Sequence, residues 1–379
     1  MRIVVDCRPL TSRPTGVAQY LMAAINVWSD INSSFEFILL AHKPLHPDVI
    51  GALKTSKNIT YVICPAPIFK LNGLLWFIFW FPFMAIRWRG DCIWGPCGML
   101  PPFYSKKLIG LLTVNDLVFR AMPSSMSART RFAYGLLSGN SIKRADLIWA
   151  ISNFTANQID QYYPKRRTNH IVVGCGLNPL RAGYKNSEST LLEIKQLFKV
   201  TDRTLLFVGT LEPRKNLQFL LSLMKNLSID GYKLLIVGCS GWGKSNVESI
   251  INDPIFPKKS VIFCDFVSDD TLQALYETVP FFISTSLMEG FGLPQLEAMA
   301  VGCPVIAAAN SAVTEVVGAG GVLVEGWDVD LWCQKIRNAH KDREILSASA
   351  KVQAKKFSID DACSEISEIL NLRLLKTDK

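Results

Sequence analysis

Short apolar runs, separated by amphipathic stretches of helical period, repeat along the whole chain. The runs are rich in β-branched and aromatic residues, and their continuous apolar character is typical of strands buried on both faces of a sheet. In the first half of the chain they cover residues 2–6, 35–41, 59–64, 91–96, 108–116, 145–152 and 170–176. In the second half they cover residues 204–211, 232–238, 260–266, 281–286, 304–309 and 321–325. Strand and helix in regular alternation predict an α/β protein built on doubly wound parallel sheets.

One segment interrupts this pattern. Residues 177–200 break the rhythm of strands with polar and turn-forming residues before a helix, and a chain of 379 residues exceeds one typical domain. We therefore expect two Rossmann-like domains, residues 1–180 and 181–355, and a C-terminal helix at 356–379 that packs back on the first domain. Doubly wound sheets bind ligands at the carboxyl ends of their strands, so the chemistry should lie in loops that border a cleft between the two domains.

Composition narrows the class of protein. The ten cysteines have no paired zinc-type spacing, and the first residues, "MRIVVDCRPL", are typical of a strand and not of a secretion signal. We therefore expect reduced thiols and a cytoplasmic protein. The net charge of +9 would suit nucleic acid, an anionic membrane or a phosphorylated ligand. Nucleic acid is disfavoured, because the basic residues form no concentrated patch interleaved with aromatics.

Residues 74–86, "LLWFIFWFPFMAI", are continuously apolar and are flanked by Lys70, Arg87 and Arg89. The stretch is shorter than the roughly 20 residues that cross a bilayer, and Pro82 interrupts it. Two interpretations stay open. The segment is either a buried helix of the first domain or an interfacial segment whose aromatics enter the headgroups of an anionic membrane.

A basic loop follows the run at 204–211. Gly209 permits a tight turn, Pro213 ends the strand, and Arg214 with Lys215 stands where the next helix begins. Two cations are unfavourable at a helix start, because that end already carries partial positive charge. A bound diphosphate would balance them; the alternative is a solvated basic turn.

A second candidate loop, "MEGFGLPQLEAMA", covers residues 288–300 and leads into a helix with Pro294 in its first turn and Gly302 at its end. The backbone N–H groups at this helix start would suit a phosphate oxygen. Glu289 before the turn and Glu297 inside the helix could accept hydrogen bonds from sugar or ribose hydroxyls. Alternatively, Glu297 only complements the helix dipole and Glu289 only caps the turn.

Together, "GTLEPRKN" (209–216) and "MEGFGLPQLEAMAVGCPVIA" (288–307) closely resemble the retaining glycosyltransferases of the GT-B fold. That family includes sucrose and glycogen synthases and bacterial lipopolysaccharide mannosyltransferases, and two glutamates separated by seven residues are its signature. The resemblance covers most of the chain and is strongest from Leu205 to Glu325. It implies a GT-B architecture and a nucleoside-diphosphate sugar as the donor substrate, with no cofactor and no metal.

The resemblance also implies roles for residues in the second domain. Arg214 and Lys215 would hold the donor diphosphate and stabilise its growing charge, and Glu297 would bind the ribose hydroxyls. The Glu289 carboxylate would contact the donor sugar and phosphates together with the backbone of the segment 291–293. The donor-binding set in this domain is then Gly209, Arg214, Lys215, Glu289, Phe291, Gly292, Leu293 and Glu297.

In the first domain, "RPLTSRPTGVAQY" resembles the family's glycine loop and places Gly16 in the donor site near the reaction centre. The family often has arginine where Gln19 stands. It commonly has histidine at the position of Asn115, which cannot take a proton. If the leaving phosphate accepts the proton of the acceptor, Asn115 or Asp116 only positions the acceptor, and Asp116 completes the catalytic set of Arg214, Lys215 and Glu289.

Two sequence patterns and the shared nucleotide pocket leave other functions open. "GCSGWGKS" (238–245) matches a phosphate-loop pattern, with Asp265 as a possible magnesium ligand, and so indicates a nucleotide hydrolase. An epimerase of the same fold or a nonenzymatic binder would use the same nucleotide pocket. Asp328 and Asp330 form a D-x-D pattern, although the position before a helix favours capping over metal binding.

The sequence thus predicts a retaining hexosyltransferase with GDP-mannose as its leading donor. The predicted acceptor is a lipid-linked saccharide or a growing surface polysaccharide at the inner face of the plasma membrane. The identities of the donor sugar and of the base rest on the resemblance alone, since no motif in the sequence specifies either.

Overall fold

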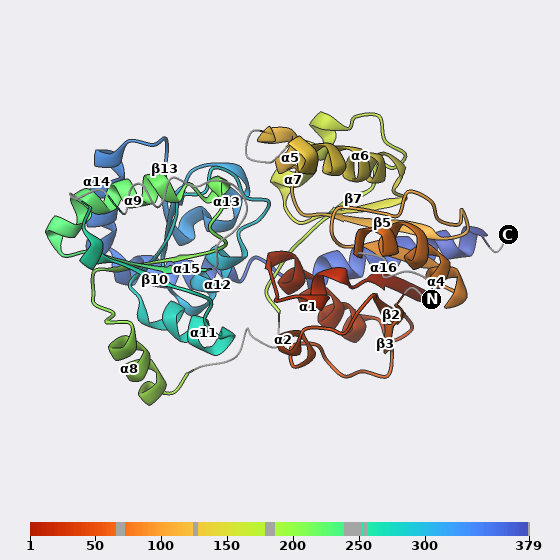
Figure 1. The fold of residues 1–379 in the computed structure, drawn as a ribbon, viewed down its shortest axis with the longest axis horizontal. Helices are drawn as coiled ribbons and strands as arrows, with labels where there is room; N and C mark the ends of the chain where they lie inside the picture. The colour runs from red at the N-terminus through yellow and green to blue at the C-terminus, as the bar shows by residue number, and fades with distance from the viewer. Residues whose placement is uncertain (66–72, 124–127, 179–185, 239–251, 253–255, 378–379) are drawn as a thin grey trace. The chain divides into compact units, whose positions relative to one another are not determined.

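The computed structural model describes residues 1–65, 73–123, 128–178, 186–238, 252 and 256–377 (Figure 1). Two compact units make up the chain, residues 1–183 with 358–379 and residues 184–357. Every apolar run singled out from the sequence contains a strand of a parallel sheet. The prediction of two doubly wound α/β domains is therefore confirmed, and the strands are shorter than the runs by up to four residues.

The first unit contains a seven-stranded parallel sheet in the order β3-β2-β1-β4-β5-β6-β7. Its strands are β1 (Arg2–Asp6), β2 (Glu36–Ala41), β3 (Ile59–Ile63), β4 (Cys92–Gly95), β5 (Ile109–Val114), β6 (Leu147–Ala150) and β7 (Ile171–Val173). Its helices are α1 (Gly16–Ile31), α2 (Pro47–Ile50), α3 (Gly73–Leu75), α4 (Phe81–Arg87), α5 (Val118–Ala121), α6 (Ala128–Arg144), α7 (Asn153–Tyr162) and α16 (Asp360–Thr377).

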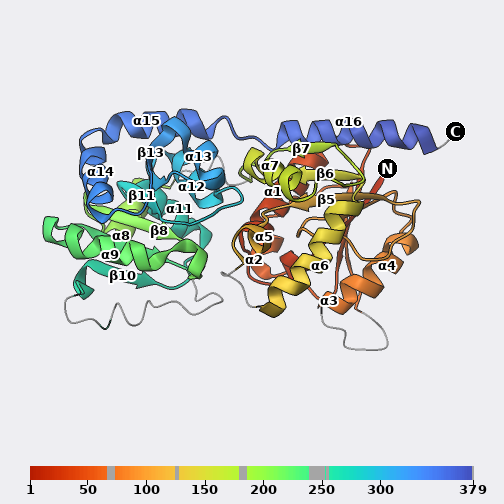
Figure 2. The same cartoon turned by 90° about the horizontal axis from the view of Figure 1, so that it is seen from above.

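Three tryptophan side chains join the sheet of the first unit to α1. The indole of Trp28 packs edge-on against Trp94 and Trp149, and those two rings stack with their centroids 5.7 Å apart. Helix α16 lies beside α1 and β7 (Figure 2), and the Trp28 Nε1 donates a hydrogen bond to the Ser367 hydroxyl over 2.7 Å. The last helix is thus part of the first unit's core.

The aromatic segment 73–87 has two different faces. Trp76, Phe77 and Phe81 are fully buried in the core below the sheet, as expected of a buried helix. Phe79 and Phe83 on the other face are 62% and 52% exposed, as expected of an interfacial segment. The segment includes a π-helical turn at residues 76–80 before α4. In the described part of the chain, no helix combines the length and the apolar character needed to cross a bilayer.

The second unit contains a six-stranded parallel sheet in the order β10-β9-β8-β11-β12-β13. Its strands are β8 (Thr204–Val208), β9 (Lys233–Val237), β10 (Val261–Cys264), β11 (Phe281–Ser284), β12 (Val305–Ala308) and β13 (Gly321–Val324). Its helices are α8 (Glu188–Leu197), α9 (Leu217–Leu227), α11 (Asp269–Thr278), α12 (Leu293–Val301), α13 (Ser311–Val317), α14 (Val329–Lys341) and α15 (Arg343–Ala354).

Helices α9 and α14 pack together over one face of this second sheet, where Leu220, Met224 and Trp332 are fully buried. Helices α11, α12, α13 and α15 pack against one another. This double layer covers the strands from both sides, so the exposed functional groups gather in the loops at the strand ends.

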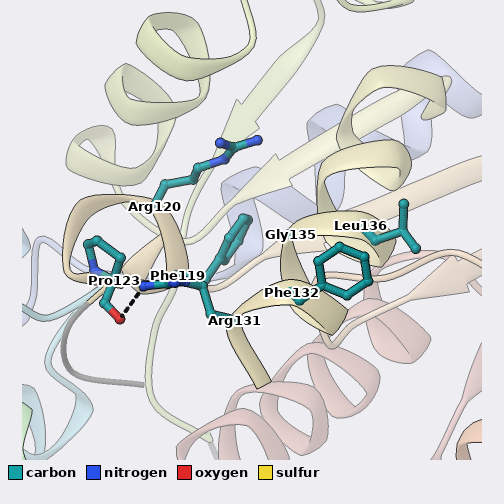
Figure 3. A pocket seen from close by; sticks show the side chains of 7 residues that line it. All are labelled: Phe119, Arg120, Pro123, Arg131, Phe132, Gly135 and Leu136. Atoms are coloured by element: carbon teal, nitrogen blue, oxygen red, sulfur yellow. Dashed lines mark hydrogen bonds between the residues drawn. The ribbon is translucent and has the colours of Figure 1, made fainter. Parts of the chain in front are cut away.

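The first unit also carries a pocket of about 480 Å³ beside α5 and α6 (Figure 3). Its lining residues are Phe119, Arg120, Pro123, Arg131, Phe132, Gly135 and Leu136.

Candidate active site

The strand order of the second unit brings two distant loops together. Strands β8 and β11 are neighbours at the centre of the sheet, and the strand order reverses between them. The loops after β8 and β11 therefore leave from adjacent strands at the same edge, which is where doubly wound sheets bind ligands. Arg214 and Lys215 lie in the first loop and Glu289 lies in the second. Sequence positions more than 70 residues apart are thus placed side by side.

The first loop has the expected local structure. A 3-10 turn covers Pro213–Lys215, and α9 begins at Leu217 after Asn216 takes a left-handed conformation with φ of 52°. Residues of the second loop donate hydrogen bonds to backbone carbonyls of this turn. The Leu287 N–H donates to the Arg214 carbonyl over 2.8 Å, and the Thr285 hydroxyl donates to the Lys215 carbonyl over 3.1 Å.

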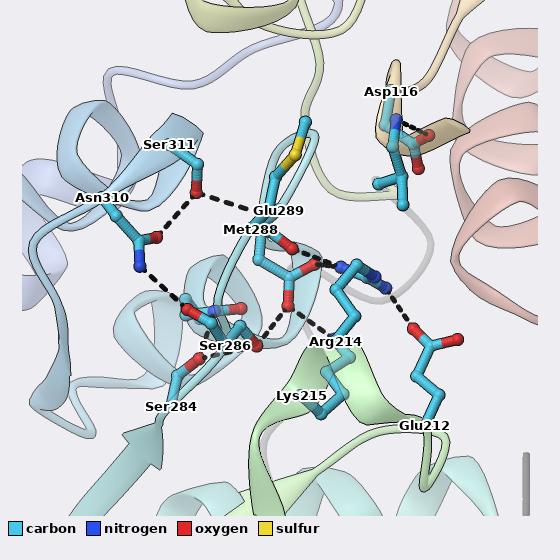
Figure 4. Close-up of polar contacts among 12 residues, drawn as sticks. Asp116, Glu212, Arg214, Lys215, Ser284, Ser286, Met288, Glu289, Asn310 and Ser311 are labelled. Carbon is cyan, nitrogen blue, oxygen red and sulfur yellow. Dashed lines mark hydrogen bonds and ion pairs between the residues drawn. The ribbon is translucent and has the colours of Figure 1, made fainter. Parts of the chain in front are cut away.

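Arg214, Lys215, Glu212 and Glu289 form a buried ion cluster (Figure 4). The Arg214 guanidinium bridges the two carboxylates, with distances of 2.5 Å to Glu289 Oε2 and 2.5 Å to Glu212 Oε1, and it also donates to the Met288 carbonyl. The Lys215 Nζ donates to Glu289 Oε1 over 2.6 Å. The four side chains are between 7% and 14% exposed.

This cluster corrects part of the sequence reasoning. The two cations are neither solvated nor left for an external anion, because Glu212 and Glu289 balance them within the protein. The alternative of a solvated basic turn is wrong for the same reason. Arg214 and Lys215 both have acidic partners in the protein, so unbalanced positive charge is no reason to expect a diphosphate beside them. Their role in donor binding remains a prediction.

The Glu289 carboxyl is ionised throughout the ordinary pH range. Burial alone would raise its pKa, but the charges of Arg214 and Lys215 and the hydrogen bonds from Lys215 and Ser286 outweigh burial. The net effect lowers the pKa of Glu289 from 4.5 to about 2. Such a carboxylate is an acceptor of hydrogen bonds and cannot donate a proton at neutral pH.

Three polar residues near Glu289 were not identified from the sequence. The Ser286 hydroxyl donates to Glu289 Oε1 over 2.6 Å, and the Ser311 hydroxyl accepts from the Glu289 N–H over 3.0 Å. The Asn310 amide donates to the Ser286 carbonyl over 3.0 Å. Short polar residues after β11 and β12 are the only sequence signal for them, and that signal is common in loops. These contacts fix both the backbone and the carboxylate of Glu289.

Gly209 leaves space for the side chain of Lys215. Its φ is +154°, and a Cβ built on it would lie 3.2 Å from the Lys215 Cε and 3.5 Å from its Nζ. The absent side chain leaves room for the lysine to cross the loop and reach Glu289. The glycine was predicted for a tight turn, and the structure adds this close approach as a second physical reason.

The start of α12 agrees with the sequence pattern. The helix covers Leu293–Val301, with proline in its first turn and Gly302 as the left-handed residue at its end. Gly292 precedes it with φ of +114°, a conformation that only glycine adopts easily. The Phe291 side chain is 4% exposed and packs edge-on against Phe357, so only its backbone is left for a ligand.

Glu297 lies on α12, eight positions after Glu289. Its Oε2 accepts a hydrogen bond of 3.0 Å from the hydroxyl of Tyr276, a buried residue of α11. The side chain is half-buried at that position. The hydrogen bond holds the carboxylate in one orientation, and the ribose-binding role implied by the resemblance stays a prediction.

The predicted residues of the first unit are described within that unit alone. Gly16 is exposed at the start of α1, with open space around the position of a Cβ. The Asn115 amide donates to the Pro96 carbonyl over 2.8 Å and so ties the loop after β5 to the loop after β4. Asp116 Oδ1 accepts over 3.1 Å from the N–H of Val118, the first residue of α5 (Figure 4).

Two competing motifs have different outcomes. Asp328 caps α14 through a 2.7 Å hydrogen bond from the Leu331 N–H, so the prediction of capping at the D-x-D pattern is confirmed. Among the described residues, no group of three or more histidine, cysteine, aspartate or glutamate side chains could hold a metal ion. The phosphate-loop pattern at 238–245 lies outside the described residues, except for Gly238.

Solved structures of glycosyltransferases share the architecture of the whole chain. Sucrose-phosphate synthase from Thermosynechococcus elongatus superposes with a TM-score of 0.76 at 17% identity, covering 100% of both chains. HepE from Anabaena in complex with UDP and glucose superposes with a TM-score of 0.75 at 18% identity, covering 98% of this chain and 99% of that one. The fold is therefore that of the GT-B glycosyltransferases.

The second unit matches a known protein family. Residues 189–357 match the family of glycosyl transferases group 1, so this part of the chain is a domain of that family. The chain is 30% identical to O-antigen chain mannosyltransferase B of Escherichia coli over 234 residues, which are 59% of this chain and 60% of that protein. It is 25% identical to O-antigen chain mannosyltransferase RfbU of Salmonella typhimurium over 361 residues, or 91% and 93% of the two chains. The chain is thus homologous to O-antigen mannosyltransferases.

Proposed function

We propose that this protein is a retaining glycosyltransferase that moves a hexose from a nucleoside-diphosphate sugar to a lipid-linked saccharide or a growing surface polysaccharide. The leading donor is GDP-mannose, because the O-antigen mannosyltransferases are homologous to the chain. The observation that carries the proposal is the buried cluster of Arg214, Lys215 and Glu289 at the point where the strand order reverses, inside a domain of this family.

The cluster has the chemistry that a departing diphosphate needs. As the bond from the anomeric carbon to the diphosphate oxygen breaks, negative charge grows on that oxygen. The Arg214 and Lys215 N–H groups and the backbone N–H groups at the start of α12 would stabilise this charge. Because Glu212 and Glu289 hold the two cations in fixed positions, little reorganisation is needed when the charge develops.

Retention of the anomeric configuration needs no carboxylate nucleophile on this proposal. The acceptor oxygen forms its bond to the anomeric carbon on the face from which the diphosphate leaves, and the acceptor proton passes to the departing diphosphate oxygen. Glu289 does not serve as the base, because both of its oxygens already accept hydrogen bonds from cationic groups. It holds the cations and offers its remaining lone pairs to the sugar hydroxyls.

Work at the cytoplasmic face of a membrane is part of the same proposal. The exposed aromatic face of segment 73–87 carries Phe79, Phe83 and Ile86, and the exposed Arg87 and Arg89 lie at its end. Aromatic rings enter the headgroup region and arginines attract anionic lipids, so this face suits a membrane surface that presents lipid-linked acceptors.

A donor panel tests the proposed function. The purified chain is incubated with GDP-mannose and other sugar nucleotides, with and without a lipid-linked saccharide, and the released nucleoside diphosphate is measured. Acceptor-dependent release supports a transferase, and NMR of the product shows whether the anomeric configuration is retained. An altered sugar nucleotide without acceptor indicates an epimerase, and affinity without turnover indicates a binder. ATP turnover that Lys244→Ala abolishes would favour the hydrolase.

Site variants connect the activity to the cluster. Lys215→Met should lower turnover by about 100-fold or more, as expected for the loss of one preplaced donor. Lys258→Met, which removes an exposed lysine in the same unit, is the matched control. Near-normal turnover by a folded Lys215→Met variant would refute the proposed role of the cluster.

A further inference from the structure

The pocket beside α5 and α6 in the first unit has the character of a binding site for an anion with an apolar tail. Its volume of about 480 Å³ lies within the range of small-molecule pockets, roughly 300–1,000 Å³. Two guanidinium groups, two phenylalanine rings and a leucine line it (Figure 3). Arg214 and Lys215 in the second unit form ion pairs with glutamates, whereas the arginines of this pocket have neutral partners.

Both arginines of the pocket are held by neutral groups. The Arg120 Nε donates to the Tyr163 hydroxyl over 3.2 Å, and the Arg131 Nη1 donates to the Pro123 carbonyl over 3.5 Å. Within the described residues, neither guanidinium forms an ion pair with a carboxylate. Helix α6 itself, "ARTRFAYGLLSGNSIKR", contains four basic and no acidic residues. Arg131 also lies in the first turn of α6, where the helix dipole disfavours a cation. An external anion would balance the charge of the two guanidinium groups and would offset the unfavourable interaction of Arg131 with the helix dipole.

The apolar side of the pocket is open to solvent. Phe119 is 5% exposed and forms part of the core, whereas Phe132 and Leu136 are 74% and 53% exposed. These two side chains are four residues apart on α6 and therefore share one face of the helix. Exposed apolar groups beside guanidinium groups make a surface that fits a ligand with both a charged and a hydrocarbon part.

Gly135 is a second and independent sign of a ligand site. Glycine in a helix interior destabilises the helix relative to alanine, so its presence needs a reason. A Cβ on Gly139, one turn later, would lie 3.1 Å from the Tyr163 hydroxyl, and packing explains that glycine. A Cβ on Gly135 would meet nothing within 4 Å. Its missing side chain keeps the wall of the pocket open.

The pocket is also close in the chain to the predicted acceptor side of the reaction. Asp116 accepts a hydrogen bond from the N–H of Val118, the first residue of α5, and the next two residues of α5, Phe119 and Arg120, line the pocket. The loop that the resemblance assigns to the acceptor therefore leads directly into this pocket.

We propose that the α5–α6 pocket binds the phosphate end of a lipid-linked acceptor. Arg120 and Arg131 contact the phosphate or diphosphate, and Phe132 and Leu136 contact the first part of the hydrocarbon chain. This assignment rests on the proposed function, because it names the site for the acceptor of that reaction. It requires an amphiphilic phosphate, and it excludes a site for a bare anion or for a neutral hydrocarbon.

Binding can be measured without turnover. The purified full-length chain is titrated with farnesyl diphosphate, inorganic pyrophosphate and farnesol by isothermal titration calorimetry. We expect farnesyl diphosphate to bind at least tenfold more tightly than either of the others. Arg120→Gln combined with Arg131→Gln should weaken its binding at least tenfold, and Gly135→Leu should weaken it similarly by filling the pocket. Lys143→Gln removes one positive charge from an exposed position of α6 and should change binding less than twofold.

Several results would overturn the assignment. Equal affinity for pyrophosphate would leave an anion site only, and equal affinity for farnesol would leave an apolar pocket only. Unchanged binding by both folded pocket variants would place the ligand elsewhere. Loss of binding to phosphatidylglycerol vesicles in these variants, without any farnesyl diphosphate binding, would assign the arginines to membrane lipids. If farnesyl diphosphate binds as expected but no sugar is transferred from any donor, the proposed function fails, and the pocket stands only as a site for an amphiphilic phosphate.

Discussion

Replacing Glu289 by glutamine should destabilise the second unit in a way that depends on pH. The carboxylate has a pKa of about 2 in the folded protein, against 4.5 without these contacts. A lowered pKa stabilises the fold above pH 4.5, and this contribution is lost as the pH falls from about 4.5 to about 2. The difference corresponds to about 3 kcal/mol of unfolding free energy at neutral pH. That size agrees with the roughly 3–5 kcal/mol lost when one partner of a buried ion pair is removed.

Urea unfolding of the full chain, followed by circular dichroism between pH 7 and pH 2.5, measures this contribution. Hydrogen exchange in α9 and α12 assigns the transition to the second unit. The difference between wild type and Glu289→Gln should be about 3 kcal/mol at pH 7 and should shrink steadily below pH 4.5. Glu193→Gln, at an exposed position of α8 in the same unit, should show no such difference. A Glu289→Gln gap that is absent, or that stays constant with pH, would refute the electrostatic account.

Three further changes test other contacts. Gly209→Ala should lower both stability and turnover, because the new Cβ lies 3.2 Å from Lys215 Cε at a φ of +154°; a fully active, equally stable variant would contradict this in paired melting and turnover assays. Asp328→Ala should cost about 1 kcal/mol in urea unfolding and leave turnover unchanged; a loss of turnover restored by a divalent metal would reveal a metal site instead. Phe83→Ser should weaken cosedimentation with anionic vesicles at an unchanged melting temperature, whereas Phe81→Ser should lower the melting temperature, since Phe81 is buried and Phe83 is 52% exposed; vesicle binding by Phe83→Ser equal to that of wild type would argue against the membrane face.

Continuous apolar runs were sufficient to predict the strands, because a strand buried on both faces has few positions open to polar residues. The boundaries were less accurate. The run at 108–116 extends beyond β5, Ile109–Val114, because Asn115 and Asp116 leave the sheet and bond to the backbone of Pro96 and Val118. For residues 74–86 the sequence left two interpretations; the structure shows one buried and one exposed apolar face, and contact with a membrane stays a prediction. A run of apolar residues without polar positions cannot show which of its sides faces solvent.

The sequence predicted three residues of the candidate site, but it did not predict their ion pairs. Motif spacing pointed to Arg214, Lys215 and Glu289, but pairing depends on β8 and β11 being neighbours, and the order of strands cannot be read from a single sequence. The helix dipole disfavours the two cations when they are considered alone, but Glu212 and Glu289 are their partners in the folded protein. The same argument is stronger for the α5–α6 pocket, because there the described structure itself gives the arginines neutral partners.

The neutrality of the ion cluster limits how it could recognise a diphosphate. Glu212, Arg214, Lys215 and Glu289 carry two positive and two negative charges, so the cluster offers a diphosphate no net charge. Attraction on the proposed function must then come from N–H groups that point at the ligand from short range. The Lys215 ammonium has three N–H groups and donates one of them to Glu289, and the start of α12 adds backbone N–H groups that have no partner within the helix. The carboxylates keep these donors in place, so their contribution lies in orientation. It follows that a mobile cation near the same loop could not replace either Arg214 or Lys215.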